Sequence, residues 1–257
     1  MTARHYGLTM IEGFVRSVEM CAPEEGEVRS GYPWSLPGVA ALAGGVALDP
    51  RVTYLIGENG TGKSTVLEAV AIAAGMNPEG GSQHFSFSTR DSHSALSESI
   101  RLTRGARRPR TSFFLRAESL FTAATYLDEM RELPGPDPLA PYGGRSLHEQ
   151  SHGESFLAVI LNRFGPNGLY LLDEPEAALS TQNCLTLLRR IHDLVTEGSQ
   201  FVIATHSPLV LAYPGALILS CGEEGLQPIA YEDAEPVRLT ESFLQARERF
   251  LKELLEY

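Results

Sequence analysis

The sequence has few of the features that build metal clusters, disulfide networks or membrane spans. Its three cysteines, Cys21, Cys184 and Cys221, lie far apart without metal-ligand spacing, so we expect reduced thiols. The N-terminus, MTARHYGLTMIEGF, lacks the apolar core of a signal peptide. The apolar run SPLVLAYPGALIL is interrupted by Pro214 and Gly215 and is too short to span a bilayer. These absences predict a soluble, cytoplasmic protein without membrane insertion.

Positive charge is scarce as well. The chain has 21 Lys and Arg residues against 32 Asp and Glu residues, a formal net charge of -11. This balance argues against non-specific binding to duplex nucleic acid as the main activity, although it allows a local basic patch. Long heptad repeats are missing too, which excludes a coiled-coil arm.

The hydrophobic pattern predicts strands that alternate with helices. Short, largely apolar stretches suit buried strands, and longer stretches with apolar residues at helical spacing lie between them. This alternation indicates an α/β fold with a largely parallel sheet, in a single domain over residues 1–257. The expected strands are 51–56, 111–115, 168–172 and 201–205, with a hairpin at 216–231, and the expected helices are 66–74, 117–132, 184–195 and 240–257.

The first chemical motif is GENGTGKS, which follows an expected strand and precedes an expected helix. A glycine-rich loop can turn several backbone N–H groups toward one anion, and the helix N-terminus adds partial positive charge. In such a phosphate loop Lys63 would reach the β- and γ-phosphates and Ser64 would bind Mg²⁺. The expected nucleotide-binding residues are Gly57, Glu58, Asn59, Gly60, Thr61, Gly62, Lys63, Ser64 and Thr65.

The second motif is LYLLDE, an apolar strand that ends in Asp173 and Glu174. Asp173 is expected at the carboxyl edge of the sheet, where it can contact Mg²⁺ directly or through water. Glu174 can polarise a water molecule for in-line attack on the γ-phosphate. A strand ending in two carboxylates is a weak signal alone, but the upstream phosphate loop strengthens it.

The third motif is FVIATHSP, which places His206 at the end of another buried strand. A strand-end histidine usually has a structural role. In a protein with a phosphate loop, an imidazole at that edge can hydrogen-bond the γ-phosphate and report its presence.

The order of these motifs resembles that of the ATP-binding-cassette (ABC) ATPases. The string GRSLHEQSHGESF…LYLLDEPEAALS…SQFVIATHSP is similar to stand-alone bacterial ATPases often called AAA family or predicted ATPases. That group is similar to the non-transporter ABC ATPases of the DNA-repair, chromosome-maintenance (SMC) and OLD type. The resemblance covers roughly residues 40–220. It implies a P-loop NTPase fold of ABC type, with a core at 1–89 and 166–257 and a helical insert at about 90–165.

The segment LHEQSHGESFLAVILNRF contains an expected helix whose start is unusually polar. Ser151 and Glu154 fit the S-x-x-E capping box. The resemblance implies a second role, because Ser151, Gly153 and Glu154 stand where ABC ATPases carry their signature sequence. There they would bind, in trans, the γ-phosphate of ATP held by the other subunit of a head-to-tail dimer.

Four residues depart from the usual ABC pattern. His152 replaces the first signature Gly, and Gln150 replaces the Leu before Ser151. Ser180 stands where transporters carry an Asp, and Glu176 gives Glu-Pro-Glu in place of Glu-Pro-Thr. These departures disfavour a transporter subunit.

Three further residues are weaker candidates. Gln83 could be the family's glutamine that touches Mg²⁺ and the attacking water, although a solvated loop residue is the simpler interpretation. Tyr32 and Trp34 precede the phosphate-loop strand, where an aromatic ring could stack on adenine or simply pack.

A local excess of arginine lies between residues 90 and 116, where seven Arg residues stand against Asp91 and Glu98. The Arg101–Arg116 region could contact nucleic acid or an acidic partner, or one arginine could reach bound ATP. A solvated charged loop is the alternative.

Together these motifs predict a Mg²⁺-dependent ATP hydrolase that closes as an ATP-sandwich homodimer and acts as a nucleotide-driven switch, on nucleic acid or in defence or repair. Two alternatives remain: the ATP-binding subunit of a membrane transporter, and a nucleotide-gated interaction module with little turnover.

Overall fold

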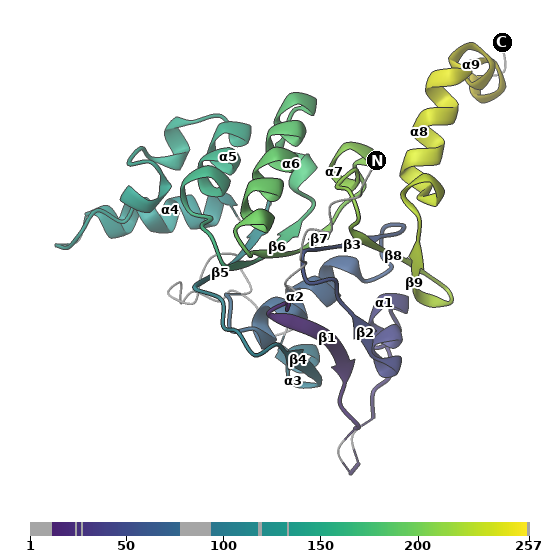
Figure 1. Ribbon diagram of the computed structural model, residues 1–257, viewed down its shortest axis with the longest axis horizontal. Coiled ribbons are helices and arrows are strands. Elements are labelled where there is room, and N and C mark those ends of the chain that lie inside the picture. The colour runs from purple at the N-terminus through teal and green to yellow at the C-terminus, as the bar shows by residue number, and fades with distance from the viewer. Residues whose placement is uncertain are drawn as a thin grey trace, which may run out of the picture.

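The computed structural model describes residues 12–23, 25–26, 28–77, 94–117, 120–132 and 134–255. In these ranges the chain forms two sheets and two layers of helices (Figure 1). The cysteines in these ranges are free thiols. Within the same ranges, none of the helices combines the length and the apolar character that crossing a bilayer would need.

The larger sheet has six strands in the order β5-β6-β7-β3-β8-β9. The first five run parallel and only β9 pairs antiparallel, at the hairpin predicted around residues 216–231. Every residue of β3, β6 and β7 is buried, as expected for strands covered on both faces. This confirms the predicted α/β class. The strands are β3 (Val52–Ile56), β5 (Thr111–Arg116), β6 (Gly168–Asp173), β7 (Gln200–Ala204), β8 (Leu217–Gly222) and β9 (Gly225–Ile229).

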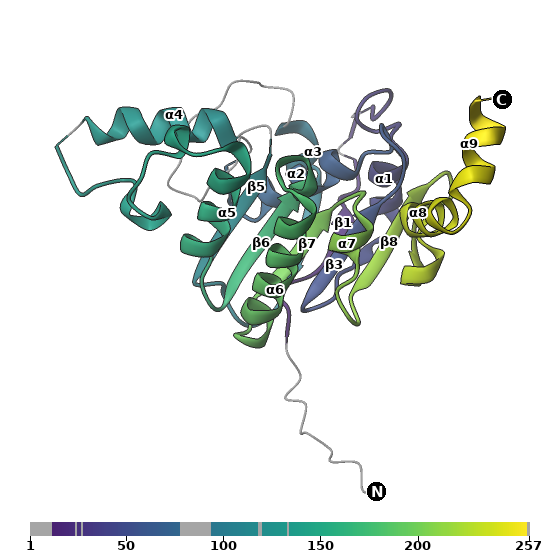
Figure 2. The ribbon, with the colours of Figure 1, turned by 90° about the horizontal axis from the view of Figure 1, so that it is seen from above.

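Helices cover both faces of this sheet, as Figures 1 and 2 show from two directions. Above it in Figure 1 lie α4 (Leu120–Arg131), α5 (His152–Asn162), α6 (Thr181–Thr196) and α7 (Pro208–Leu211). Below it lie α1 (Pro37–Ala40), α2 (Lys63–Ala73) and α3 (Ser94–Glu98). Each layer has its own apolar core against the sheet. Two more helices, α8 (Glu235–Gln245) and α9 (Arg247–Leu255), extend away from the body.

A second, antiparallel sheet joins β2 (Val46–Ala47), β1 (Val15–Met20) and β4 (Ile100–Arg104). The sequence pattern did not predict these strands. Only alternate or scattered positions of β1 are buried, and its partners are distant in the chain. Residues about 90–165 therefore contain β4 and β5 as well as α4 and α5, and β5 belongs to the central sheet.

Gln200, the first residue of β7, connects the two sheets. Its side chain is fully buried. Its Oε1 accepts the N–H of Val15 at 3.0 Å, and its Nε2 donates to the carbonyls of Val15 at 2.8 Å and Asp49 at 3.0 Å. One amide thus pairs with three backbone groups from two other segments of the chain.

We expect Gln200→Leu to lower the free energy of unfolding by about 3 kcal/mol, because a buried unpaired polar group costs about 1–3 kcal/mol. Urea denaturation measures this change. The control is Gln182→Leu on exposed α6 surface, which should change stability by about 0.5 kcal/mol or less. Equal urea midpoints for the two variants would refute the connecting role of Gln200.

Candidate functional site

The phosphate loop joins β3 to α2 and depends on three glycines with positive φ. The φ angles are +139° at Gly57, +82° at Gly60 and +98° at Gly62. A Cβ at Gly57 would lie 2.4 Å from the carbonyl oxygen of Cys221 at the end of β8. Gly57 is therefore fixed both by its backbone angle and by the neighbouring strand.

Lys63 begins α2, and its ammonium group turns back into this loop. Nζ donates to the carbonyls of Gly57 at 2.7 Å and Glu58 at 2.8 Å. Burial lowers the pKa of Lys63, and the carboxylates of Glu174 and Asp173 oppose that shift. The loop thus holds a buried cation within reach of any phosphate that it binds.

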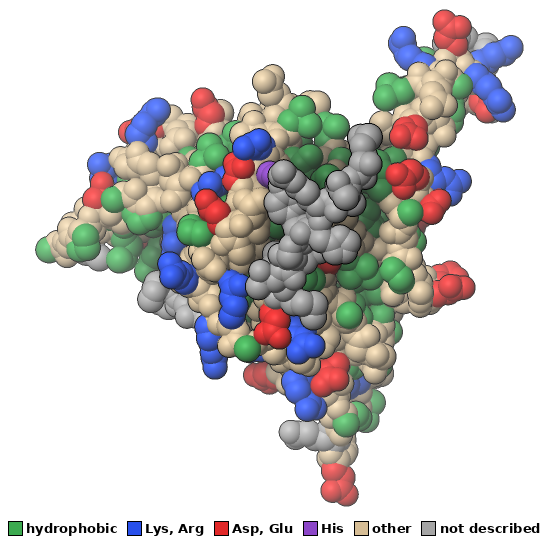
Figure 3. Space-filling model, in the orientation of Figure 1, with side chains coloured by type: hydrophobic (Ala, Val, Ile, Leu, Met, Phe, Trp, Pro, Cys, Tyr) green, Lys and Arg blue, Asp and Glu red, His purple; other side chains and the backbone are tan. Residues whose placement is uncertain are grey.

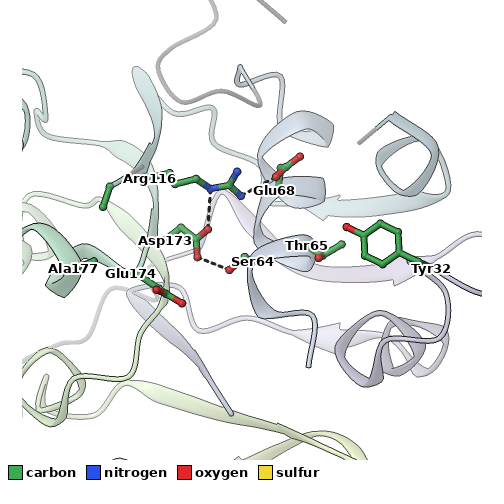
Figure 4. Close-up of a pocket in the computed structure, with 9 residues that line it drawn as sticks. Tyr32, Ser64, Thr65, Glu68, Arg116, Asp173, Glu174 and Ala177 are labelled. Carbon is green, nitrogen blue, oxygen red and sulfur yellow. Dashed lines mark hydrogen bonds and ion pairs between the residues drawn. The ribbon is translucent and has the colours of Figure 1, made fainter. Parts of the chain in front are cut away.

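Asp173, the last residue of β6, is 4% exposed and uses both carboxylate oxygens. Oδ1 accepts the hydroxyl of Ser64 at 2.9 Å, and Oδ2 accepts Nε of Arg116 at 3.0 Å (Figure 4). The structure therefore brings Ser64 and Asp173 together, as the sequence predicted. They line a cavity of about 300 Å³ with Tyr32, Thr65, Glu68, Arg116, Ala117, Glu174 and Ala177.

Glu174 and His206 face each other across the ends of β6 and β7. Glu174 Oε1 lies 3.7 Å from His206 Nε2. Glu174 has φ +47°, a left-handed conformation that is uncommon for a residue other than glycine. Strain of this kind is found where a side chain must be aimed precisely. The two residues also line a second cavity of about 590 Å³ beside Gly57, Glu58 and Asn59.

Glu176 was noted in the sequence only as a departure from the transporter pattern. In the structure its Oε1 accepts the backbone N–H of His206 at 2.5 Å. This bond fixes the turn after β6 to the turn after β7. The sequence signal that Glu176 belongs to the site was its position two residues after Glu174.

Arg116 and Glu68 also belong to the site. Arg116 ends β5, and its Nη2 donates to Glu68 Oε2 on α2 at 2.8 Å. The sequence placed Arg116 in a charged stretch of which one arginine could reach the nucleotide. Its place at the end of a predicted strand was a signal, but the pairing of β5 with β6 was needed to bring it beside Asp173.

The start of α5 forms the capping box that the sequence predicted. Ser151 Oγ donates to Glu154 Oε2 at 2.6 Å, and the N–H of Ser151 donates to the same oxygen at 2.9 Å. These bonds lower the pKa of Glu154. At Gly153 a Cβ would lie 3.0 Å from the carbonyl oxygen of Ala178, so the helix approaches the turn after β6 closely. Residues 151–154 do not line either of these two cavities.

The structure separates the two weaker aromatic candidates. Tyr32 is 66% exposed and lines the smaller cavity near Thr65, whereas Trp34 is partly buried under the guanidinium of Arg29 at 5.0 Å. Thr61 Oγ1 donates to the carbonyl of Glu58 within the loop. Gln83 lies outside the described residues.

The arginine-rich stretch does not act as one patch. Arg101 pairs with Glu19 at 3.4 Å, Arg104 donates to the carbonyl of Ala73, and Arg107 donates to Asn167. Arg116 instead points into the site. On the face shown in Figure 3, basic side chains are interspersed with acidic and apolar ones.

The site offers oxygen ligands suited to Mg²⁺. Mg²⁺ prefers hard oxygen donors and usually keeps several waters, with one or two carboxylates and substrate phosphates completing its shell. The Ser64 hydroxyl and the Asp173 carboxylate supply such donors at the start of the phosphate-binding helix. In the described part of the chain, groups of three or more His, Cys, Asp or Glu suited to a metal ion are absent.

Comparison with protein families gives one match, over residues 143–212, to the family described as "AAA domain, putative AbiEii toxin, Type IV TA system". The matched segment runs from the predicted signature region through Asp173 and Glu174 to His206. No curated protein sequence matches the chain significantly.

Solved structures similar to this chain include the SMC head domain from Thermotoga maritima, with 13% identity, 84% of this chain and 99% of that chain covered, and a TM-score of 0.43. An ABC transporter in an inward-facing conformation has 16% identity, covers 87% and 85%, and has a TM-score of 0.47. A dimeric bacterial ABC transporter cassette has 16% identity, covers 71% and 86%, and has a TM-score of 0.40.

Part of the chain, residues 143–212, thus matches an AAA family, and the fold is a mostly parallel sheet with a phosphate loop. The family match, the parallel sheet and the phosphate loop between β3 and α2 confirm the resemblance stated from the sequence.

We expect Gly57→Ala to destabilise the protein more than Gly60→Ala. Both add a side chain at positive φ, which costs about 1–2 kcal/mol. Only Gly57→Ala also collides with the Cys221 carbonyl, which adds about 1–3 kcal/mol of overpacking, because nothing lies within 4 Å of a Cβ at Gly60. Urea denaturation compares the two. If both variants unfold at the same urea concentration, contact with β8 does not constrain the loop.

Proposed function

We propose that this protein is a Mg²⁺-dependent ATPase that converts ATP and water to ADP and phosphate. The observation that carries the proposal is the arrangement of Lys63, Ser64, Asp173, Glu174 and His206 around one phosphate loop. The five come from the ends of two neighbouring parallel strands, β6 and β7, and from the start of α2, and ligands of open α/β sheets bind at that edge.

Each residue has a distinct part in the reaction. The loop N–H groups and Lys63 hold the β- and γ-phosphates. Glu174 orients the attacking water and accepts its proton as the new bond to phosphorus forms and the bond to the ADP oxygen breaks. His206 donates a hydrogen bond to the γ-phosphate from the end of β7. Ser64 and Asp173 would hold Mg²⁺, which neutralises charge on the phosphates when bound.

The ATPase would work as a head-to-tail homodimer. Ser151, Gly153 and Glu154 line neither of the two cavities beside the phosphate loop of their own chain, which leaves them for the nucleotide of a partner. The N-terminus of α5 then offers N–H groups and the positive end of a helix dipole. The Ser151 hydroxyl would turn from Glu154 to a phosphate oxygen, and the capping box would reform after release.

The process that this switch drives is a separate proposal. The matched family's description names a toxin of a type IV toxin–antitoxin system, which suits a defence role. Arg101, Arg104 and Arg107 already have local partners, which leaves less free charge in this stretch for nucleic acid. A nucleotide-gated interaction module is the second candidate, because a capped Ser151 and an altered signature would slow turnover.

For turnover, we expect Glu174→Gln to lower kcat for ATP by about 10²- to 10⁴-fold, the usual loss when a general base is removed. Phosphate release at saturating Mg²⁺ and ATP measures it. Glu197→Gln on exposed surface after α6 is the matched control and should keep wild-type kcat. If the wild-type protein releases no more phosphate than Lys63→Ala, the ATPase assignment is wrong. The nucleotide-gated interaction module would then be the remaining candidate function.

For assembly, we expect Glu174→Gln to form a dimer with Mg²⁺ and ATP but not with ADP or without nucleotide. Light scattering measures the mass in each state. Ser151→Arg in the same background should abolish the dimer, because the side chain blocks the helix start. An unchanged mass in all three states, with ATP binding confirmed, would reject the head-to-tail dimer of this chain.

A further inference from the structure

Arg116 is held between two buried carboxylates on the wall of the smaller cavity. Its Nε donates to Asp173 at 3.0 Å and its Nη2 to Glu68 at 2.8 Å. Glu68 and Asp173 are each 4% exposed, whereas the side chain of Arg116 is 20% exposed and lines the cavity. The arginine therefore reaches both the buried pair and the open space.

The guanidinium of Arg116 stays protonated in this position. Burial alone would lower its pKa, but the adjacent Asp173 and Glu68 raise it, and the outcome is a raised pKa. The guanidinium carbon also lies 5.2 Å from the centre of the Phe114 ring, which restricts the plane of the group. A fixed, permanently charged donor thus faces the cavity.

Arg116 has more N–H groups than its two carboxylate partners engage. A guanidinium has five N–H groups, and the two ion pairs engage one from Nε and one from Nη2. Three N–H groups remain that the contacts with Asp173 and Glu68 do not use. Guanidinium N–H groups commonly pair with phosphate oxygens, so these remaining groups can serve a phosphate in the cavity.

The position of Arg116 specifies which phosphate it would meet. Ser64 and Arg116 bind the two oxygens of one carboxylate, so the arginine lies beside the pair of residues proposed to hold Mg²⁺ at the phosphates. Glu174, which faces the attacking water in the proposed reaction, lines the same cavity. In the proposed reaction the water oriented by Glu174 attacks the terminal phosphate, so that phosphate is the one expected beside Arg116.

We propose that Arg116 also binds the terminal phosphate of ATP and thereby contributes to the distinction between ATP and ADP. This inference rests on the proposed function and assigns a contact within it. Asp173 and Glu68 hold the arginine in place, so the contact forms without a large side-chain movement. When the γ-phosphate leaves, the same two carboxylates retain the arginine.

The test compares the affinity for a non-hydrolysable β,γ-imido analogue of ATP with the affinity for ADP, both with Mg²⁺, by calorimetry. The variants are Arg116→Gln and the double variant Arg116→Gln with Glu68→Gln, which removes one buried carboxylate and so protects folding. Arg101→Gln is the matched control, an exposed arginine that pairs with Glu19 away from the site.

The expected result is a loss of affinity for the ATP analogue of about 10- to 100-fold in both Arg116 variants, the range for a charge-assisted hydrogen bond, with ADP affinity changed less than about threefold. Arg101→Gln should match the wild type. Two results with a folded double variant would overturn the inference: an equal loss of affinity for both nucleotides, or no loss of affinity. In either case, nucleotide binding by the wild-type protein would still support a nucleotide site. Wild-type protein that binds neither nucleotide would instead overturn the proposed function, and this inference with it.

Discussion

The carboxylate of Asp173 is the interaction on which the rest of the site depends. It joins α2 through Ser64 to β5 through Arg116, and it lies at the end of β6 between them. Because it is 4% exposed, its charge needs those partners, and each partner in turn is oriented by it. The phosphate loop, the carboxylate strand and the outermost parallel strand are thereby fixed to one another before any nucleotide binds.

Local motifs made much of this architecture predictable from the sequence. Gly57, Lys63 and Ser64 are set by a strand, a loop and a helix that follow one another, so their geometry is contained in one segment. Asp173 and His206 end apolar strands, and parallel strands bring such ends to one edge. Arg116 needed the strand order β5-β6, a pairing of segments some 57 residues apart that hydrophobic periodicity does not encode.

The strands of the antiparallel sheet were not predicted from the sequence for a related reason. Its strands are short, partly exposed and paired across the chain, with β1 meeting β4 over residues 15–20 and 100–104. Their stabilisation comes from tertiary contacts such as the Gln200 amide and not from a clear alternation of apolar residues. A polar side chain therefore joins the two sheets where the sequence shows only the start of a buried strand.

Two hydrogen bonds also link the turn that carries Glu174 to the turn that carries His206. The N–H of Glu174 donates to the carbonyl of Ala204, and the N–H of His206 donates to the side chain of Glu176. The turns after β6 and β7 are thus bonded in both directions, around a Glu174 backbone held at φ +47°. A displacement of His206 by phosphate would be transmitted to the turn that aims Glu174, and through Ala178 to the start of α5, against which Gly153 packs. The proposed phosphate contact, the carboxylate proposed to orient water and the helix proposed to meet the partner's nucleotide are therefore mechanically connected within one chain.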